Sequence, residues 1–120
     1  MPPVDMTPRN ADFLISEANG FRSRAEVTVN ATTAALEPGT VLGMITSSGN
    51  YIRHDSGLSN GAQNVAGILM IAIGAEGANR TVIVRDAEVA GADLIYEDGA
   101  NASQITAANA ALAALGIVVR

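Results

Sequence analysis

Residues 25–31 read AEVTVNA, a strict alternation of apolar and polar side chains. Ala25, Val27, Val29 and Ala31 lie on one side of an extended chain, which predicts a strand with one buried face. Further segments with a strand pattern follow at residues 41–46, 51–53, 65–73, 81–85, 87–89, 94–96 and 117–119. The sequence therefore predicts a mostly β (α+β) fold with a small β-sandwich or barrel-like body.

Turn-forming residues separate these expected strands. In Glu37–Thr40, Pro38 presets φ at the second position and Gly39 supplies a positive φ at the third, which is typical of a type II turn. We also expect a polar loop at residues 54–64 and a turn at residues 74–79.

A single helix is expected over residues 102–115. Asn101 and Gln104 have the spacing of a capping box, and Gly116 stands where a left-handed residue commonly ends a helix. The helical spacing predicts a buried stripe and an outward face, which consist of Ile105, Ala108, Leu112 and Leu115 and of Thr106, Asn109 and Ala113.

Composition limits the size and kind of the protein. The chain has 120 residues, 48% of them hydrophobic, which fits one folded domain. Aromatic residues make up only 3% and Trp is absent, so we expect a thin core and self-association. The absence of Cys excludes disulfides and thiol chemistry.

The charges argue against nucleic acid as a partner. The seven cations are all arginines scattered along the chain, the acids number twelve, and the net charge is −5. A groove for phosphate backbones needs clustered Lys and Arg instead. The first residues lack the pattern of a signal peptide, and the longest apolar run, residues 65–73, is far shorter than the roughly 20 residues that span a bilayer. We therefore expect a soluble protein with no membrane partner.

Two groups of residues could suggest an enzyme. His54, Asp55 and Ser56 have the residue types of a catalytic triad, but contiguous side chains diverge, and we interpret them as an exposed loop. Asp86 and Glu88 share one face of an expected strand, about 7 Å apart at Cα, a separation that a glycosidase could use. A sugar site also needs an aromatic platform, which this chain can hardly supply, so we interpret the pair as a solvated strand face.

The sequence has no motif for a cofactor or a metal ion. Residues 74–77 lack the spacing of a nucleotide-binding loop, and without any Lys a phosphate-gripping P-loop is impossible. One His and no Cys would leave a zinc site to carboxylates, which is unusual for zinc. We predict no catalytic residues, no cofactor, no metal and no small-molecule substrate.

Residues 1–24 differ from the rest of the chain. Their prolines prevent the first stretch from joining a central strand, so we expect a flexible N-terminal arm ahead of a body over residues 25–120. The apolar island FLIS, residues 13–16, has two interpretations. It either folds back as an edge strand of its own domain or adds as a strand to a sheet edge on another chain.

Four segments of the body can be compared, in their order and spacing, with those of known proteins. They are residues 37–43 (EPGTVLG), 61–69 (GAQNVAGIL), 84–89 (VRDAEV) and 115–119 (LGIVV). In this order and spacing, the chain from about residue 25 to residue 120 resembles the head decoration proteins of lambda-like tailed bacteriophages. The resemblance implies a non-enzymatic homotrimer that binds the outside of the expanded capsid at its threefold positions and clamps neighbouring major capsid proteins together.

The resemblance also implies roles for particular residues. The trimer body would include Pro38, Gly39, Gly67, Ile68 and Leu69. A capsid-binding arm, ordered by pairing with coat-protein strands, would include Phe13, Leu14, Ile15, Ser16, Phe21, Arg22 and Arg24. The protein would be made in the cytoplasm of the bacterial host and would lie on the outer capsid surface of the virion, where its negative charge is kept away from packaged DNA.

Two other classes of function stay open at this point. One is a small β-rich module that recognises a ligand or receptor on the host. The other is a small hydrolase that uses Asp86 and Glu88.

Overall fold

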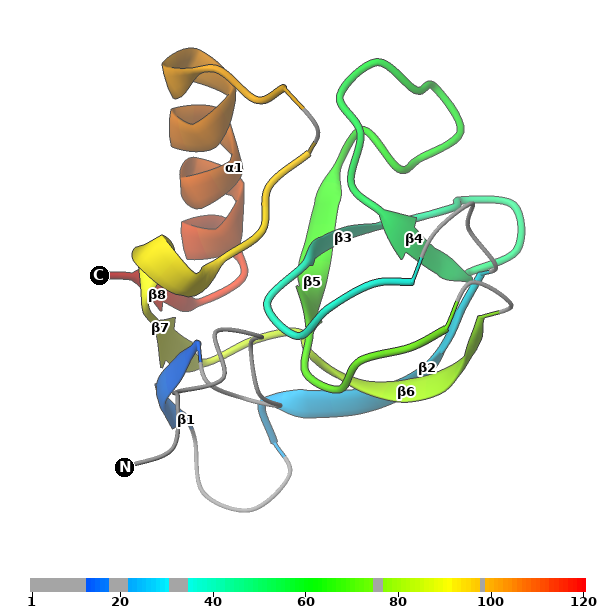
Figure 1. Cartoon of the computed structure of the whole chain (residues 1–120), viewed down its shortest axis with the longest axis horizontal. Helices are drawn as coiled ribbons and strands as arrows, with labels where there is room; N and C mark the ends of the chain where they lie inside the picture. The colour runs from blue at the N-terminus through cyan, green and yellow to red at the C-terminus, as the bar shows by residue number, and fades with distance from the viewer. Residues whose placement is uncertain (1–12, 18–21, 31–34, 75–76, 98) are drawn as a thin grey trace, which may run out of the picture.

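The computed structural model describes residues 13–17, 22–30, 35–74, 77–97 and 99–120. In these ranges the chain forms a five-stranded barrel, a small three-stranded sheet and one α-helix (Figure 1). The mostly β fold with a barrel-like body and one C-terminal helix is therefore confirmed. None of the described helices is long and apolar enough to cross a membrane.

The barrel is closed, with the strand order β2-β4-β3-β5-β6. Its strands are β2 (Arg24–Val29), β3 (Val41–Met44), β4 (Tyr51–Arg53), β5 (Val65–Leu69) and β6 (Ala78–Ile83). The longest ladder joins β2 and β6 antiparallel over six residue pairs, and a single parallel pair, Val29 with Tyr51, closes the barrel between β2 and β4.

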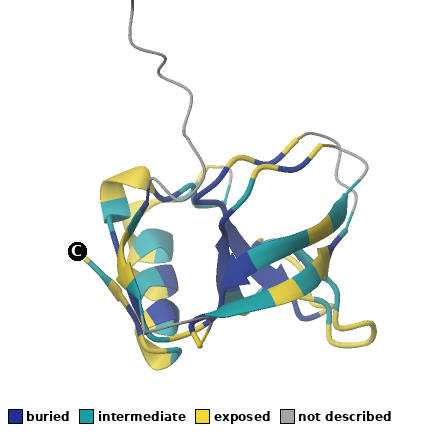
Figure 2. Ribbon diagram, turned by 90° about the horizontal axis from the view of Figure 1, so that it is seen from below, coloured by how far each residue is buried: buried dark blue, intermediate teal, exposed yellow. Residues whose placement is uncertain are grey.

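The alternation of apolar and polar residues over residues 25–31 is visible in β2. Val29 is fully buried and Val27 is half-buried, whereas Glu26 and Thr28 are exposed. Figure 2 shows exposed residues alternating with more buried ones along barrel strands. The apolar side of β2 faces a core inside the barrel, formed by Val29, Leu36, Leu42, Leu69, Ile73, Val82 and Val84.

The small sheet has the strand order β1-β7-β8. It consists of β1 (Leu14–Glu17), β7 (Ala87–Val89) and β8 (Ile117–Val119), and a short 3-10 helix (Gly91–Asp93) follows β7. The helix α1 (Ala102–Ala114) leads directly into β8. A second core lies between this sheet, the helix and the barrel, and contains Phe13, Val41, Ile68, Met70, Ile83, Ala87, Val89, Leu94, Leu112 and Ile117.

The predicted turn and helix signals are found in the structure. Gly39 has a φ of +95°, and the Thr40 amide donates to the Glu37 carbonyl at 3.3 Å, as the type II turn requires. In the capping box, the Gln104 amide donates to Asn101 Oδ1 at 2.9 Å, and the Asn101 amide donates to Gln104 Oε1 at 2.8 Å. Gly116 ends the helix with a φ of +84°.

Several expected elements differ in their bounds from those observed. The strand expected at residues 65–73 ends at Leu69, because Ile73 leaves β5 and forms a separate bridge with Leu36 through two hydrogen bonds of 3.0 Å. The expected turn at residues 74–79 is shorter than predicted, since β6 already begins at Ala78. Residues 94–96 form no strand, and only Ile95 pairs, in an isolated bridge with Thr40.

The helix packs as the stripe predicted, with one exception. Ala108 and Leu112 are buried, and Ile105 and Leu115 are partly buried. Asn109, expected to face outward, is only partly exposed, because its Oδ1 accepts a hydrogen bond of 2.6 Å from the hydroxyl of Tyr96.

Candidate interaction surface

The three-stranded sheet lies at the end of the molecule where the chain enters the fold (Figure 1). Strand β7 is central, so β1 and β8 each keep one side without a neighbouring strand in the described part of the chain. The barrel is closed and has no such edge. Unpaired backbone groups at a strand edge can pair with a strand of another protein. The small sheet is therefore the candidate interaction surface.

Phe13 fastens the start of β1 to the body. Its side chain is 1% exposed and lies in the core beside the helix, and its carbonyl accepts a hydrogen bond of 2.7 Å from the Ala90 amide. Leu14 is partly buried against the same core. Phe13 and β1, expected in the arm, thus pack against the body, because a large aromatic side chain gains most by leaving water. Of the two interpretations of residues 13–16, the structure shows the edge strand of their own domain, since β1 pairs with β7.

Glu17 connects the small sheet to the barrel. Its carboxylate accepts hydrogen bonds from the guanidinium of Arg24, the first residue of β2, and from the buried Ser23 hydroxyl. Arg24 Nε lies 3.0 Å from each carboxylate oxygen. The bonds from Arg24 hold the pKa of Glu17 below its usual value, and the same pair raises the pKa of Arg24. Arg24 is thus engaged within its own chain.

Glu88 ties the three strands together on the outer face of the sheet. From β7 it accepts a hydrogen bond of 2.7 Å from Arg120 Nε, just after β8, and one of 3.1 Å from Ser16 Oγ in β1. The Arg120 bond, assisted by Ser16, lowers the pKa of Glu88. Strand β7 is therefore cross-linked by side chains to both of its neighbours.

Asp86, just before β7, is also engaged with an arginine. Arg22 Nε donates to Asp86 Oδ2 at 3.1 Å, and Asp86 itself has a φ of +52°, an uncommon value for a residue with a side chain. Glu88 lies in β7 but Asp86 precedes it, so the expected pair on one strand face does not form, and each carboxylate accepts a hydrogen bond from an arginine of its own chain. This arrangement differs from an acid/base pair, which must face a common substrate.

Two β-branched side chains project from the edge strands. Ile15 in β1 is 54% exposed and Val118 in β8 is 44% exposed. Ile15 lies at a shift in the β1–β7 register between Leu14 and Ser16, which puts two consecutive residues on the outside. Of the residues expected in the arm, Ile15, Ser16 and Arg22 are exposed, and Phe21 lies outside the described residues. Sequence reasoning missed Val118, because three apolar residues in a row do not reveal which of them faces outward.

The triad-like residues occupy a different place from the one expected. His54 is buried, with Nε2 3.0 Å from the Gln63 carbonyl and Nδ1 3.5 Å from Glu97 Oε2. Ser56 Oγ donates to Glu97 Oε1 at 2.7 Å and not to His54. A triad needs the nucleophile bonded to the base, so this group has another arrangement.

The group around Glu97 fastens loop 54–64 to the helix. Gln104, in the first turn of α1, donates to both Ser56 and Glu97. His54 was expected to be exposed, and it is buried because Glu97, far along the sequence, supplies a carboxylate partner. Within the described ranges, no three His, Asp or Glu side chains gather closely enough to hold a metal ion.

The residues assigned to the body lie in its interior. Pro38 and Gly39 form a buried turn, and a Cβ on Gly39 would lie 2.6 Å from the Asp93 carbonyl oxygen. Gly67, Ile68 and Leu69 are buried in β5. A Cβ on Gly67 would lie 2.7 Å from the backbone of β6, which explains why this position takes glycine. These residues hold the barrel together from within.

Comparison with known proteins identifies a family to which the chain is similar. The model of the family described as bacteriophage lambda head decoration protein D matches residues 3–117. The match includes the barrel, β1, β7 and the first residue of β8. No curated protein sequence matches the chain.

Proposed function

Because this chain belongs to the family of bacteriophage lambda head decoration protein D, a structural protein of the phage capsid, we propose that it binds the expanded capsid from outside as a trimer. In this proposal each trimer sits at a threefold position, contacts the major capsid protein and stabilises the shell against the pressure of packaged DNA.

The free edges of the small sheet carry this proposal. A strand of the coat protein that pairs with one of these edges would gain main-chain hydrogen bonds, and the exposed Ile15 and Val118 would add apolar contacts. The side-chain bonds of Glu88 hold the three strands in one arrangement before binding. Such preorganisation lowers the entropy lost on association.

We also propose that the first residues of the chain contact the shell. Phe13 is anchored in the core next to the small sheet, and residues 1–12 precede it directly in the sequence. We assign capsid binding to this leading segment together with Ile15, Ser16 and Val118. In this proposal the arm comprises residues 1–12, whereas the sequence predicted residues 1–24.

Binding to one state of the shell is enough to stabilise that state. A ligand that recognises only the expanded lattice stabilises it by about 4.1 kcal/mol per site when its free concentration is about 1,000 times Kd. In a trimer, the second and third contacts become intramolecular, and avidity can exceed the affinity of one contact by roughly 10²–10⁴. Each contact can therefore be weak, as expected for edges only three or four residues long.

The net charge of the chain suits the outside of the shell. A charge of −5 would be repelled by the phosphates of DNA inside, whereas the outer surface is separated from them by the coat.

Deletion of residues 2–12 tests the proposal, with cosedimentation on expanded and unexpanded shells as the measurement. The full-length protein should pellet with expanded shells only, and the deletion variant should lose most of this binding. Its unfolding midpoint in urea should stay unchanged, because Phe13 is retained.

A matched control is Thr106→Asp, which adds a charge on the exposed face of the helix and should bind normally. Undiminished binding of the deletion variant would remove the leading segment from the interface. Binding of the full-length protein to host cells but to neither kind of shell would favour a receptor-binding module instead.

A further inference from the structure

Four large apolar side chains are exposed in the described part of the chain, and they fall into two pairs. Ile15 and Val118 belong to the small sheet, while Met44 is 39% exposed and Leu58 is 38% exposed on the barrel side. In Figure 1 the loop that carries Leu58 stands at the opposite end of the molecule from β1, β7 and β8. The loop with Leu58 is therefore remote from the surface assigned to the shell.

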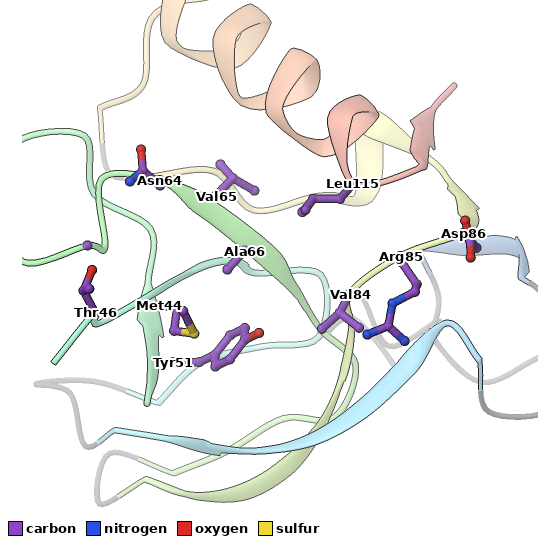
Figure 3. Close-up of a pocket in the computed structure, with 11 residues that line it drawn as sticks. Met44, Thr46, Tyr51, Asn64, Val65, Ala66, Val84, Arg85, Asp86 and Leu115 are labelled. Carbon is purple, nitrogen blue, oxygen red and sulfur yellow. The ribbon is translucent and has the colours of Figure 1, made fainter. Parts of the chain in front are cut away.

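Met44 borders a groove of about 590 Å³ between the barrel and the end of the helix. Figure 3 shows its lining, in which the apolar residues are Met44, Tyr51, Val65, Ala66, Val84 and Leu115. Burial in this lining raises the pKa of Tyr51, an effect that the nearby Arg85 partly opposes. A second hollow of about 370 Å³ shares Asn64, Val65 and Leu115 with it and continues along α1. The two together form one long concave face.

Leu58 lies on a loop that its own hydrogen bonds hold in shape. The Gly57 amide donates to Asp55 Oδ1 at 2.9 Å, and the Leu58 amide donates to the Asp55 carbonyl at 3.2 Å. The Asp55 amide in turn donates to the Ala62 carbonyl, and Ser56 is bonded to Glu97. The loop thus presents one large apolar side chain among polar neighbours, and little conformational entropy remains to be lost when it docks.

We propose that Leu58 of one copy inserts into the groove bordered by Met44 on the next copy, and that this contact builds the trimer. The inference rests on the proposed trimeric function and names its interface. The projecting loop and the groove are different patches of the same chain, so the contact is heterologous, and such contacts produce a closed ring when the rotation between copies closes.

The charges beside the two patches are complementary. Asp55 is exposed beside Leu58, whereas Arg85 is exposed at the end of the groove, where Asp86 is already engaged by Arg22. A chain with a net charge of −5 repels its own copies, and a local acidic-to-basic contact offsets this repulsion and fixes the orientation. This match favours a second copy as the occupant of the groove.

The test is the mass of the full-length protein by sedimentation equilibrium. The wild type should be a trimer, and both Leu58→Asp and Met44→Glu should shift it to monomer, by at least tenfold in the association constant of each contact. Val118→Asp is the matched control, since it charges the other exposed pair and should leave the trimer intact. Both altered side chains are exposed, so each variant should still fold and unfold cooperatively, with its midpoint lowered only by the stabilisation that trimer association gives the wild type.

Mixing the two variants distinguishes this contact from any other. A Met44→Glu chain keeps its normal loop and a Leu58→Asp chain keeps its normal groove, so an equimolar mixture should form dimers that neither variant forms alone. If Leu58→Asp does not fold, Leu58→Ser takes its place in the same mixture.

Two results would overturn the inference. A wild-type trimer that persists in both variants would place the interface elsewhere and leave the capsid function standing. A monomeric wild type at all concentrations would contradict the trimer itself, and with it this interface.

Discussion

The barrel and the small sheet differ in whether their strands have free edges. In the barrel, β2 pairs with both β4 and β6, so the sheet closes and every strand has two neighbours. In the small sheet, β1 and β8 each have one neighbour and are limited to four and three residues. Short, cross-linked edges resist unwanted pairing but stay available to a specific partner. The closed unit supplies stability, and the open unit supplies binding.

The two units are joined by few but specific contacts. Phe13 inserts from the start of β1 into the core shared with the barrel and the helix, and the Glu17–Arg24 pair connects β1 to the first residue of β2. The comparison therefore predicts that changes at these connections affect folding, whereas changes at the free edge affect binding alone.

The largest expected effect is the loss of the Phe13 anchor. Phe13→Ala should lower the free energy of unfolding by about 3–5 kcal/mol, because it removes a fully buried aromatic side chain and leaves a cavity. Chemical denaturation measures the change. A loss below about 1 kcal/mol would show that β1 is not part of the folded body, and the deletion of residues 2–12 serves as the comparison with no expected loss.

A smaller effect, on binding to the shell, is expected at the edge of β8. The Gly116 carbonyl accepts from the Ala87 amide, and the Arg120 amide donates to the Val89 carbonyl, so these two residues direct their backbone groups toward β7. Because backbone groups alternate in direction along a strand, those of Val119 point away from β7. Val119→Pro removes that outward amide and should weaken binding to expanded shells by roughly tenfold, about 1.4 kcal/mol, the size expected for one lost hydrogen bond.

The matched variant is Val119→Ala, which loses more of the side chain but keeps the amide. It should bind close to normally even if it is slightly less stable. Equal losses of binding in the two variants would mean that the side chain at position 119, rather than strand pairing, contacts the shell.

The smallest expected effect concerns the Glu17–Arg24 connection. The pKa of Glu17 is lowered in the folded state, so the pair contributes stability that is present above the unfolded pKa of about 4.5 and is lost as pH falls through the lower folded value. Glu17→Gln should reduce the free energy of unfolding by about 1 kcal/mol at neutral pH. Urea midpoints at pH 7 and pH 3 should show this difference shrinking in acid, and a constant difference would contradict the assignment.

Local signals in the sequence were sufficient for the parts of the fold that local chemistry controls. The alternation over β2, the Pro38-Gly39 turn and the capping box of Asn101 and Gln104 each depend on residues close together, and all are present in the structure. The pairing of Ile73 with Leu36 and the burial of His54 beside Glu97 depend on partners far along the chain. No period or spacing near either residue reveals such a partner.

The candidate surface was only partly accessible to sequence reasoning. The apolar island at residues 13–16 was recognised, and its two interpretations could not be separated, because the residues that accept it, such as Val89 and Leu112, lie more than seventy positions away. Val118 and the groove beside Met44 carried no signal at all, since exposure of an apolar residue depends on which neighbours fail to cover it.

The most direct measurement is hydrogen–deuterium exchange of the full-length protein, alone and bound to expanded shells. The account predicts that peptides covering residues 13–17 and 116–120 exchange more slowly on the shell, while loop 54–64 keeps the exchange rate that it has in the free trimer. Slower exchange confined to the barrel or to loop 54–64, with the small sheet unchanged, would contradict the assignment of the shell contact to the open sheet.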